Sequence, residues 1–276
     1  MNVVKMRGGI GNQMFQYAFG KMLLKNNKSV AYDISWYIPR RTEQSQYPRP
    51  FRMPLFKLSS FDIHEFDPAN PIIYEKRVGF NPKVFNMLNE NNFDGYWQYY
   101  SYYESILSDL YEEFQLRTDY YTEEFMKMAE RIWNCESVAV HVRRGDYLHH
   151  RKGGYGNLPF KYYFNAIQAV KGDLFFFSDD IPWCKDTFLK AYFPNRQITF
   201  VDLDDYLCFE LMRFCKHNII SNSTFSWWAA LMNMYSDKVV ICPKHYLGVS
   251  TKESEACRYP KVWIKIEDYY RAYQGC

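Results

Sequence analysis

Short apolar runs alternate with stretches of helical periodicity through the second half of the chain. The run from Val138 to Val142 is mostly β-branched, which predicts a short strand buried on both faces. Other runs predict strands over residues 173–180, 197–202, 217–221 and 239–243. Apolar residues at helical spacing predict helices over residues 160–170, 181–192 and 206–215, and a further helix that opens at Ser223. This alternation indicates a parallel sheet of Rossmann type.

The first half of the chain begins in the same way. A strand over residues 3–6, a helix over 14–24 and a strand over 29–34 are predicted, and helices follow over 106–114 and 122–133. Thr122 is the expected N-cap of the last of these helices. Residues 38–93 are proline-rich and irregular, which is typical either of a solvated surface loop or of a wall that meets a substrate.

The predicted fold class is α/β. The chain of 276 residues is long enough for one large domain or two small ones. We expect the helix over 122–133 to lead from one to the other, which gives an N-terminal domain of residues 1–134 and a C-terminal domain of residues 135–276.

Charged side chains follow the strand 138–142, although a buried strand has no packing reason to carry them. His141, Arg143, Arg144 and Asp146 gather at its carboxyl end, where open α/β sheets bind ligands. Two adjacent arginines suit an anion with several oxygens, because the guanidinium fork matches phosphate. The alternative, two surface arginines paired with Asp146 and other carboxylates, remains open.

Two more predicted strands end in polar groups. Asp179 and Asp180 could accept hydrogen bonds from a guanine edge or from ribose hydroxyls, or could simply start a helix before Pro182. The stretch Ser221-Asn222-Ser223-Thr224 could bind a pyrophosphate at a helix N-terminus, or could be ordinary N-capping. With the arginines, these groups describe one anionic ligand of nucleotide size.

The stretch Arg7-Gly-Gly-Ile-Gly-Asn-Gln13 joins the first predicted strand to the first helix. Gly9 and Gly11 would let the backbone approach a phosphate, and Asn12 and Gln13 could contact a sugar or a nucleotide. With the acid at Asp33 the stretch is similar to a dinucleotide-binding fingerprint, but Met14 stands at its third glycine position. NAD binding is therefore disfavoured, although an NAD-dependent nucleotide-sugar oxidoreductase remains an alternative.

Composition narrows the class of protein. Lys and Arg number 34 against 31 Asp and Glu, a net charge of +3, so no nucleic acid is expected as a partner. The aromatic fraction of 20% favours a glycan or nucleotide binder, a non-catalytic carbohydrate-binding protein included. Residues 96–100 could form a core strand or a sugar-stacking platform, whereas Trp227 and Trp228 are interpreted as packing.

The cysteines and the hydropathy suggest a compartment. Seven scattered Cys, without metal-ligand spacing, indicate reduced thiols, and no apolar run is long enough to span a bilayer. A cytoplasmic protein is expected, with peripheral association at the inner face of the membrane left open.

Four segments in order, 8–18, 141–147, 177–180 and 221–228, resemble the motif set of the α-1,2-fucosyltransferases, glycosyltransferase family 11. The resemblance implies a GT-B-like pair of Rossmann-type domains around a central cleft. It also implies inverting transfer of L-fucose from GDP-β-L-fucose to the 2-hydroxyl of a galactose in a glycan acceptor, without a metal or other cofactor. Asp202-Leu-Asp204 is accordingly interpreted as a strand end and helix cap, not as a metal clamp.

The same resemblance suggests residue roles. His141 and Arg143 match the guanine- and phosphate-contacting His and Arg of related fucosyltransferases. The expected catalytic residues are Arg143, Asp146 and Arg144. The expected donor-binding residues are Gly9, Gly11, Asn12, Gln13, His141, Arg143, Asp179, Asp180, Asn222, Ser223 and Thr224. The general base stays open among Asp146, His149 and His150. Strand alternation predicts that His141 and Arg143 share one side, whereas Arg144 faces the other and braces the loop through Asp146.

Overall fold

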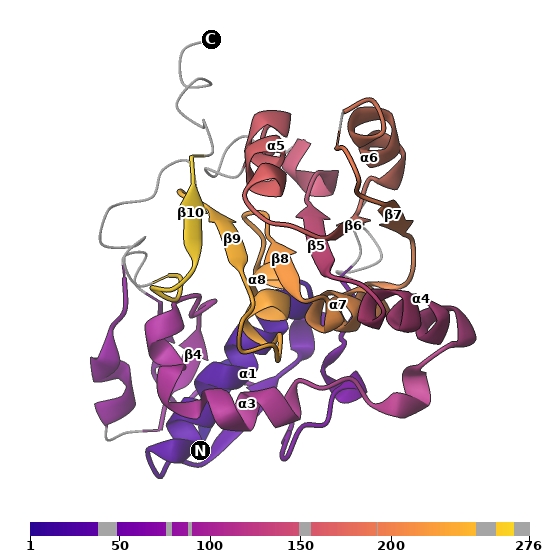
Figure 1. Ribbon diagram of the computed structural model, residues 1–276. Coiled ribbons are helices and arrows are strands. Elements are labelled where there is room, and N and C mark those ends of the chain that lie inside the picture. Colours follow the sequence, from indigo (N-terminus) through magenta and orange to yellow (C-terminus); the bar gives the residue numbers. More distant parts are fainter. Residues whose placement is uncertain are drawn as a thin grey trace. The chain divides into compact units, whose positions relative to one another are not determined.

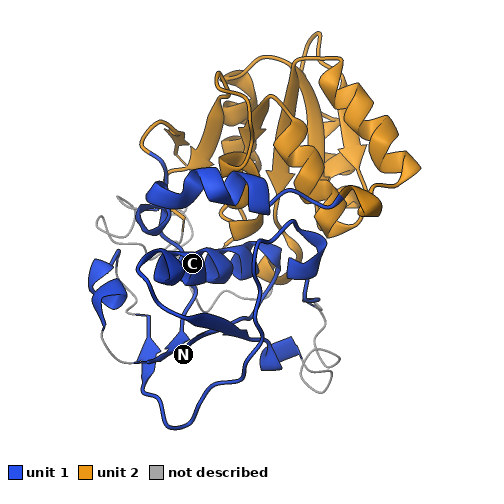
Figure 2. Ribbon diagram, turned by 90° about the horizontal axis from the view of Figure 1, so that it is seen from below, with its two compact units in different colours: residues 1–117, 251–260 blue, residues 118–250, 261–276 orange. Residues whose placement is uncertain are grey.

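The structure is a computed structural model that describes residues 1–37, 49–75, 79–87, 90–148, 156–191, 193–246 and 258–267. Its chain forms two compact units, each built on a parallel sheet (Figures 1 and 2). Unit 1 comprises residues 1–117 and 251–260, and unit 2 comprises residues 118–250 and 261–276. The predicted α/β class, with a parallel sheet in each half of the chain, is confirmed. None of the described helices has both the length and the apolar character needed to cross a membrane.

Unit 1 contains a four-stranded sheet in the order β2-β1-β4-β3, and every pair in it is parallel. Its elements are β1 (Asn2–Lys5), α1 (Ile10–Lys25), β2 (Val30–Asp33), β3 (Ile72–Tyr74), β4 (Asn92–Asp94) and α3 (Leu107–Glu113). Short 3₁₀ turns lie at Ser35–Tyr37, Met53–Leu55, Pro82–Asn86, Tyr100–Tyr102 and Glu104–Ile106. The helix α1 begins four residues earlier than the apolar pattern indicates, because its first turn is the polar Gly-rich stretch.

The aromatic stretch 96–100 is not a strand, and its Trp97 and Tyr99 belong to the core of unit 1. The strand β4 comes just before it and ends at Asp94. Trp97 is 1% exposed and stacks on Phe19, with ring centroids 4.0 Å apart, and Tyr99 is 4% exposed. These two rings therefore serve packing and cannot stack on a sugar.

Unit 2 contains a six-stranded parallel sheet in the order β10-β9-β8-β5-β6-β7 (Figure 1). Its strands are β5 (Ser137–Val142), β6 (Asp173–Ser178), β7 (Ile198–Val201), β8 (His217–Ile219), β9 (Val240–Pro243) and β10 (Ile264–Ile266). Its helices are α4 (Glu123–Trp133), α5 (Phe160–Gln168), α6 (Ile181–Phe188), α7 (Asp205–Phe214) and α8 (Thr224–Leu231), and 3₁₀ turns lie at Thr118–Tyr120 and Gly145–Leu148. The chain runs outward from β5 to β7 and then returns to β8 on the other side. This doubly wound order puts the topological switch point between β5 and β8.

The two faces of β5 are covered by different helices. Val138, Val140 and Val142 lie in one buried cluster with side chains of α5 and α6. His141 points to the other face, where its ring centroid lies 5.4 Å from that of Phe225 in α8. All six residues of β5 are buried, as predicted for a strand covered on both faces.

The helix α4 belongs to unit 2, whereas the sequence placed the division after residue 134. Its Phe125 and Trp133 rings lie 5.9 Å and 5.1 Å from the Phe214 ring of α7. Thr122 caps the helix as predicted, accepting a hydrogen bond from the Phe125 backbone N–H at 3.1 Å. An amphipathic pattern shows that a helix has a buried face but not which sheet it covers, and the two placements differ for that reason.

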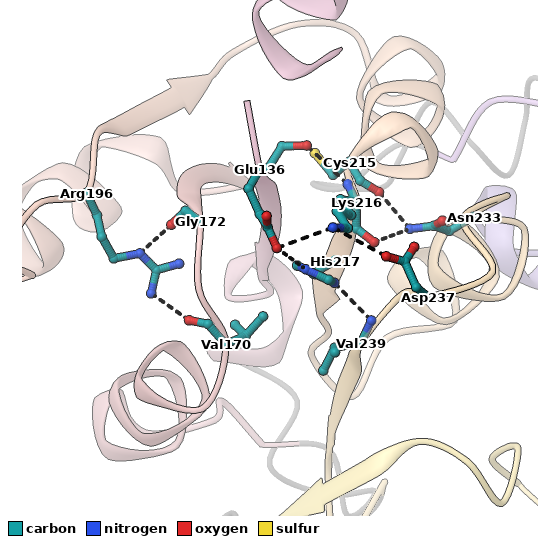
Figure 3. A network of polar contacts seen from close by, with 11 residues as sticks. Glu136, Val170, Gly172, Arg196, Cys215, Lys216, His217, Asn233, Asp237 and Val239 are labelled. Carbon is teal, nitrogen blue, oxygen red and sulfur yellow. Dashed lines mark hydrogen bonds and ion pairs between the residues drawn. The ribbon is translucent and has the colours of Figure 1, made fainter. Parts of the chain in front are cut away.

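Polar contacts join the loops at the amino ends of the strands of unit 2 (Figure 3). The His217 Nε2 lies 3.1 Å from a Glu136 carboxylate oxygen, and His217 Nδ1 accepts the Val239 backbone N–H at 2.9 Å. Arg196 donates to the carbonyls of Ile167 and Val170 at 2.8 and 3.0 Å, and also to that of Gly172. These contacts stabilise the loops at the amino ends of the strands. The candidate site lies at the opposite edge, at the carboxyl ends.

Candidate functional site

The three polar strand ends singled out in the sequence lie next to one another, because β8, β5 and β6 are neighbours in the sheet. Val142 is level with Ser178 across the β5–β6 pair, and Val140 is level with Ile219 across the β5–β8 pair. Because the strands are parallel, their carboxyl ends point to the same edge of the sheet. The predicted convergence of residues 141–146, 178–180 and 221–226 is therefore confirmed.

Arg143 lies at the centre of this edge, between two carboxylates. Its Nη1 lies 2.7 Å from Asp179 Oδ2, and its Nη2 pairs with Asp146 Oδ1. Burial alone would lower the pKa of Arg143, but the charges of Asp179 and Asp146 outweigh burial and raise that pKa above its ordinary value. The side chain remains 17% exposed, so a permanently charged guanidinium faces solvent at the switch point.

Arg144 turns to a different set of partners. Its Nε lies 2.9 Å from Asp180 Oδ2, and its guanidinium carbon lies 3.9 Å from the centre of the Trp183 ring. The expected brace from Arg144 to Asp146 is wrong, because Asp146 pairs with Arg143 instead. The strand ends at Val142, so strand alternation no longer governs where the two arginine side chains point.

Asp180 begins the helix α6. Its Oδ1 accepts a hydrogen bond from the Trp183 backbone N–H at 3.1 Å, and Pro182 lies in the first turn. The interpretation of Asp180 as a helix start is confirmed. Trp183 was not singled out in the sequence. Its position in the first turn of α6 is visible there, but its contact with Arg144 depends on the folded chain.

His141 bridges the switch point. It is 5% exposed, and its Nδ1 lies 2.8 Å from the Oγ of Ser221, at the end of β8. Burial, and to a lesser extent the charge of Arg143, lowers the pKa of the His141 imidazole to about 3. The imidazole is therefore neutral near pH 7 and ties β5 to the loop that leads into α8.

We expect His141 to make stability depend on pH. Its pKa is about 3 in the folded chain against an ordinary 6.5, so between these values the unfolded state binds more protons and stability falls as pH falls. The slope approaches about 1.4 kcal/mol per pH unit. Denaturant unfolding at pH 6.5 and pH 5 should show the wild type losing roughly 1.5 kcal/mol more than His141→Gln. Equal losses in the two proteins would contradict this prediction.

The N-terminus of α8 forms the third part of the edge. Ser223 is its N-cap and accepts the Phe225 N–H at 3.4 Å, so ordinary capping is present. Asn222 is fully buried, donates from Nδ2 to the Gly156 carbonyl at 3.1 Å and accepts at its own carbonyl from the Tyr147 hydroxyl at 3.1 Å. Asn222 thereby holds two loops at the switch point, which sequence reasoning did not anticipate.

The two tryptophans of α8 are buried in the core. Trp227 and Trp228 are 1% and 0% exposed, as their interpretation as packing required. The contacts of Asn222, Ser223 and Thr224 with a phosphate remain predictions.

The Gly-rich stretch of unit 1 forms the start of α1. Gly9 is the N-cap, and Gly11, Asn12 and Gln13 lie in the first turn. Gly8 has a φ of +86°, and a Cβ there would lie 2.5 Å from the Asn12 Nδ2, so this position requires glycine. Asn12 accepts a hydrogen bond from Gln98 Nε2 at 2.9 Å.

Gln13 anchors a loop and does not offer its amide to a ligand. It is fully buried; its Nε2 donates to the carbonyls of Gly8 and Pro50 at 3.0 and 2.9 Å, and its Oε1 accepts from the Arg52 N–H at 2.8 Å. Both amide hydrogens are thus used within the protein. Gln13 was predicted to contact the sugar-nucleotide donor, but its amide instead positions the loop that contains Pro50 and Arg52.

Gln16 has a similar role that the sequence did not reveal. It is fully buried, accepts the Arg7 N–H at 2.9 Å and donates to the Gly95 carbonyl at 3.2 Å. Asp33, the acid of the dinucleotide-like pattern, is 2% exposed and pairs with Lys5 at 3.2 Å. This pairing accounts for Asp33 without a bound ribose.

Other candidates from the sequence fall elsewhere. Asp202 follows β7 and Asp204 occupies the N-cap position of α7, so the pair marks a strand end and helix start, although the Asp204 side chain makes no capping bond. His149 and His150 lie outside the described residues.

The family model of glycosyl transferase family 11 matches residues 1–267. The chain belongs to this family. It is 28% identical to the O-antigen biosynthesis glycosyltransferase WbnK of Escherichia coli, over 89% of this chain and 94% of that protein. It is 27% identical to an alpha-1,2-colitosyltransferase of Escherichia coli, over 96% of this chain and 98% of that protein. The family 11 assignment confirms the resemblance and makes the protein a glycosyltransferase.

Among solved structures, the chain is similar to the alpha-1,6-fucosyltransferase NodZ in a crystal soaked with GDP-fucose. The TM-score is 0.45 at 13% sequence identity, over 83% of this chain and 91% of that one. POFUT1 in complex with GDP-fucose gives a TM-score of 0.43 at 10% identity, over 87% and 97% of the two chains.

Proposed function

We propose that this family 11 glycosyltransferase moves L-fucose from GDP-β-L-fucose to the 2-hydroxyl of a galactose in a glycan acceptor, with inversion at the anomeric carbon. The observation that carries the proposal is that Arg143, which follows β5, and the N-terminus of α8, which follows the neighbouring strand β8, lie at the same edge of the sheet on either side of the switch point. A guanidinium and a helix N-terminus are the two protein groups best suited to a diphosphate.

The proposed chemistry places these groups on the leaving GDP. As the bond from fucose to phosphate breaks, negative charge grows on the β-phosphate, and a fixed positive charge at Arg143 stabilises this charge more in the transition state than before it. The positive end of the α8 dipole would stabilise the same charge. Attack by the galactose hydroxyl from the opposite side, with its proton passing to a general base, then gives an α-linked product.

A second donor deserves a direct comparison because a colitosyltransferase is among the relatives. Colitose is L-fucose without its 3-hydroxyl, so a site that binds one GDP-activated sugar needs few changes to bind the other. Specificity between them would come from a protein group that bonds the 3-hydroxyl, since losing such a bond leaves a buried polar group unpaired. We favour fucose, and the ratio of kcat/KM for the two donors decides between them.

The decisive assay incubates the protein with GDP-fucose and a panel of galactose-terminated oligosaccharides. We expect a product one deoxyhexose heavier by mass spectrometry, with an α-fucosyl linkage to the galactose 2-position by NMR. A β-linked product, a different linkage position or hydrolysis without transfer on every acceptor would refute the proposal. A panel with GDP-colitose, run in parallel, tests the second donor.

Nucleotide protection tests the donor class and separates transfer from the other hypotheses. GDP should raise the melting temperature more than ADP, UDP or NAD, because it is the nucleotide of the proposed donor. A ligand at a hundred times its Kd stabilises the folded state by about 2.7 kcal/mol, which is large enough to detect. A larger shift with NAD would favour the oxidoreductase alternative. Shifts with free oligosaccharides and none with any nucleotide would favour a carbohydrate-binding protein.

Chelation tests the expected independence from metal. We expect activity in EDTA within about twofold of the untreated enzyme, because Arg143 and the N-terminus of α8 can carry the leaving diphosphate charge that a divalent cation carries elsewhere. Initial rates are measured after dialysis against EDTA and again after Mg²⁺ or Mn²⁺ is added. A loss of activity that either ion restores would contradict this prediction.

A further inference from the structure

Each oxygen of the Asp179 and Asp180 carboxylates already accepts a bond from within the protein. Asp179 places Oδ2 2.7 Å from Arg143 Nη1 and accepts the Arg144 backbone N–H on Oδ1 at 2.9 Å. Asp180 places Oδ2 2.9 Å from Arg144 Nε and accepts the Trp183 N–H on Oδ1 at 3.1 Å. Each of the four oxygens therefore has a donor from the end of β5 or the start of α6.

This arrangement is unlike a carboxylate set to bind guanine. A guanine edge offers two neighbouring N–H donors, and a carboxylate reads them by turning both oxygens toward the same ligand. The two oxygens of Asp179 instead bind two different protein groups, one a side chain and one the backbone. A base that turned both oxygens of Asp179 toward itself would take one of its two carboxylates from Arg143 and the acceptor from the Arg144 N–H.

We propose that Asp179 is a positioning residue that fixes the Arg143 guanidinium for the donor diphosphate, and that it does not select the nucleobase. The proposal rests on the proposed function. Asp179 links the end of β6 to the end of β5 through two bonds, and Asp146 holds the other Nη of Arg143 from the 3₁₀ turn Gly145–Leu148. A guanidinium has five N–H donors, so one bond to each Nη leaves donors for two phosphate oxygens.

The charges of Arg143, Asp146 and Asp179 predict different effects on GDP binding and on turnover. Arg143 has one positive charge against two carboxylates, so Asp179 repels an incoming diphosphate while it orients the arginine. Asp179→Asn removes the repulsion and the orienting ion pair together. We therefore expect the affinity for GDP to stay the same or to increase, whereas turnover falls because Arg143 is no longer fixed where charge develops.

The experiment compares wild type, Asp179→Asn and Asp186→Asn by kcat with GDP-fucose and by the Kd of GDP and ADP. Asp186 is a matched charge control, since it lies on α6 with a side chain 70% exposed and pairs only with Lys190 among the described residues. For Asp179→Asn we expect kcat to fall on the order of 10-fold, the usual scale of one lost charge-assisted bond, with an unchanged ratio of the two Kd values. Asp186→Asn should match the wild type in all three quantities.

Coupling to Arg143 gives a second readout. Because Asp179 acts through Arg143, the double variant Arg143→Lys with Asp179→Asn should turn over within about twofold of Arg143→Lys alone. Losses that multiply would overturn the proposal. So would a GDP preference that collapses in Asp179→Asn, which would make Asp179 a nucleobase contact, or a kcat equal to that of the wild type.

Failure of the proposed function would be recognised separately, as a wild type that neither binds GDP nor transfers fucose. The same four proteins of the cycle, wild type, the two single variants and the double variant, then give denaturant midpoints. If the midpoint shift of the double variant is smaller than the sum of the two single shifts, the result supports positioning of Arg143 by Asp179. Additive midpoint shifts would overturn it.

Discussion

Arg143→Lys is expected to lower kcat/KM for transfer from GDP-fucose by about 10- to 100-fold, the largest activity loss of any conservative substitution at this edge of the sheet. Lysine keeps the positive charge but presents one ammonium group in place of a planar fork. It cannot hold Asp146 and Asp179 on separate nitrogens, as Arg143 does, and still offer a phosphate two parallel bonds. One charge-assisted hydrogen bond contributes about 1.5–3 kcal/mol, which corresponds to that range of rates.

Arg144→Lys is the matched control, because it makes the same chemical change at the adjacent position. The Arg144 guanidinium stacks on the Trp183 ring at 3.9 Å and pairs with Asp180, at the start of α6. Its loss should appear mainly as a lower unfolding free energy, because it joins a strand end to a helix start. Its effect on kcat/KM should be clearly smaller than that of Arg143→Lys.

Both variants require a check of folding by circular dichroism and denaturant unfolding before rates are compared. A kcat/KM for Arg143→Lys equal to that of the wild type, or a loss confined to Arg144→Lys, would remove Arg143 from the donor site. In that case the pairing of Arg143 with Asp146 and Asp179 would be a structural ion-pair network, the alternative that the sequence left open.

The fold was predictable where the apolar runs are long and buried. The strands β5 and β6 each span six residues and lie in the middle of the sheet, so their patterns are strong. The edge strands β3 and β10 span three residues each and were not predicted. Ile72 and Ile264 in them are 45% and 46% exposed, and so short a run without burial has no distinctive pattern.

The candidate site was predictable as a location but not as a set of contacts. Parallel strands bring their carboxyl ends together, so three polar ends in the sequence had to meet at one edge. Which carboxylate meets which arginine depends on the turn that follows Val142, and no spacing rule extends past the end of a strand. The anchor role of Gln13 was hidden for a related reason: its partners Pro50 and Arg52 lie far along the chain in an irregular segment.

Gly172→Ala is expected to lower the free energy of unfolding by roughly 3 kcal/mol or more, the largest stability loss predicted from a change of one methyl group. Gly172 has a φ of +113°, which residues with a side chain rarely adopt. A Cβ there would lie 2.1 Å from the backbone carbonyl oxygen of Glu136, too close to be accommodated without moving the chain. That carbonyl accepts the Asp173 N–H at 2.7 Å and opens the pairing of β5 with β6.

The position cannot relax easily, because its neighbours are also held. The Gly172 carbonyl accepts a hydrogen bond from Arg196 Nε, and Arg196 also donates to the Val170 carbonyl (Figure 3). A further bond from Arg196 to the Ile167 carbonyl fixes the guanidinium. Moving Gly172 away from Glu136 would therefore strain the loop between α5 and β6, or shift β6 itself, which carries Asp179 to Arg143 at its other end.

Gly79→Ala separates steric overlap from backbone strain. Gly79 also has a positive φ, +73°, but a Cβ there meets no atom of the described residues within 4 Å. It should cost only the left-handed backbone penalty, about 1–2 kcal/mol. Urea unfolding of both variants measures the difference, which is the cost of forcing a methyl group against the Glu136 carbonyl. Equal losses in the two variants would mean that the backbone at the start of the β5–β6 pair moves aside at no cost. Gly172 would then be required only for its backbone conformation.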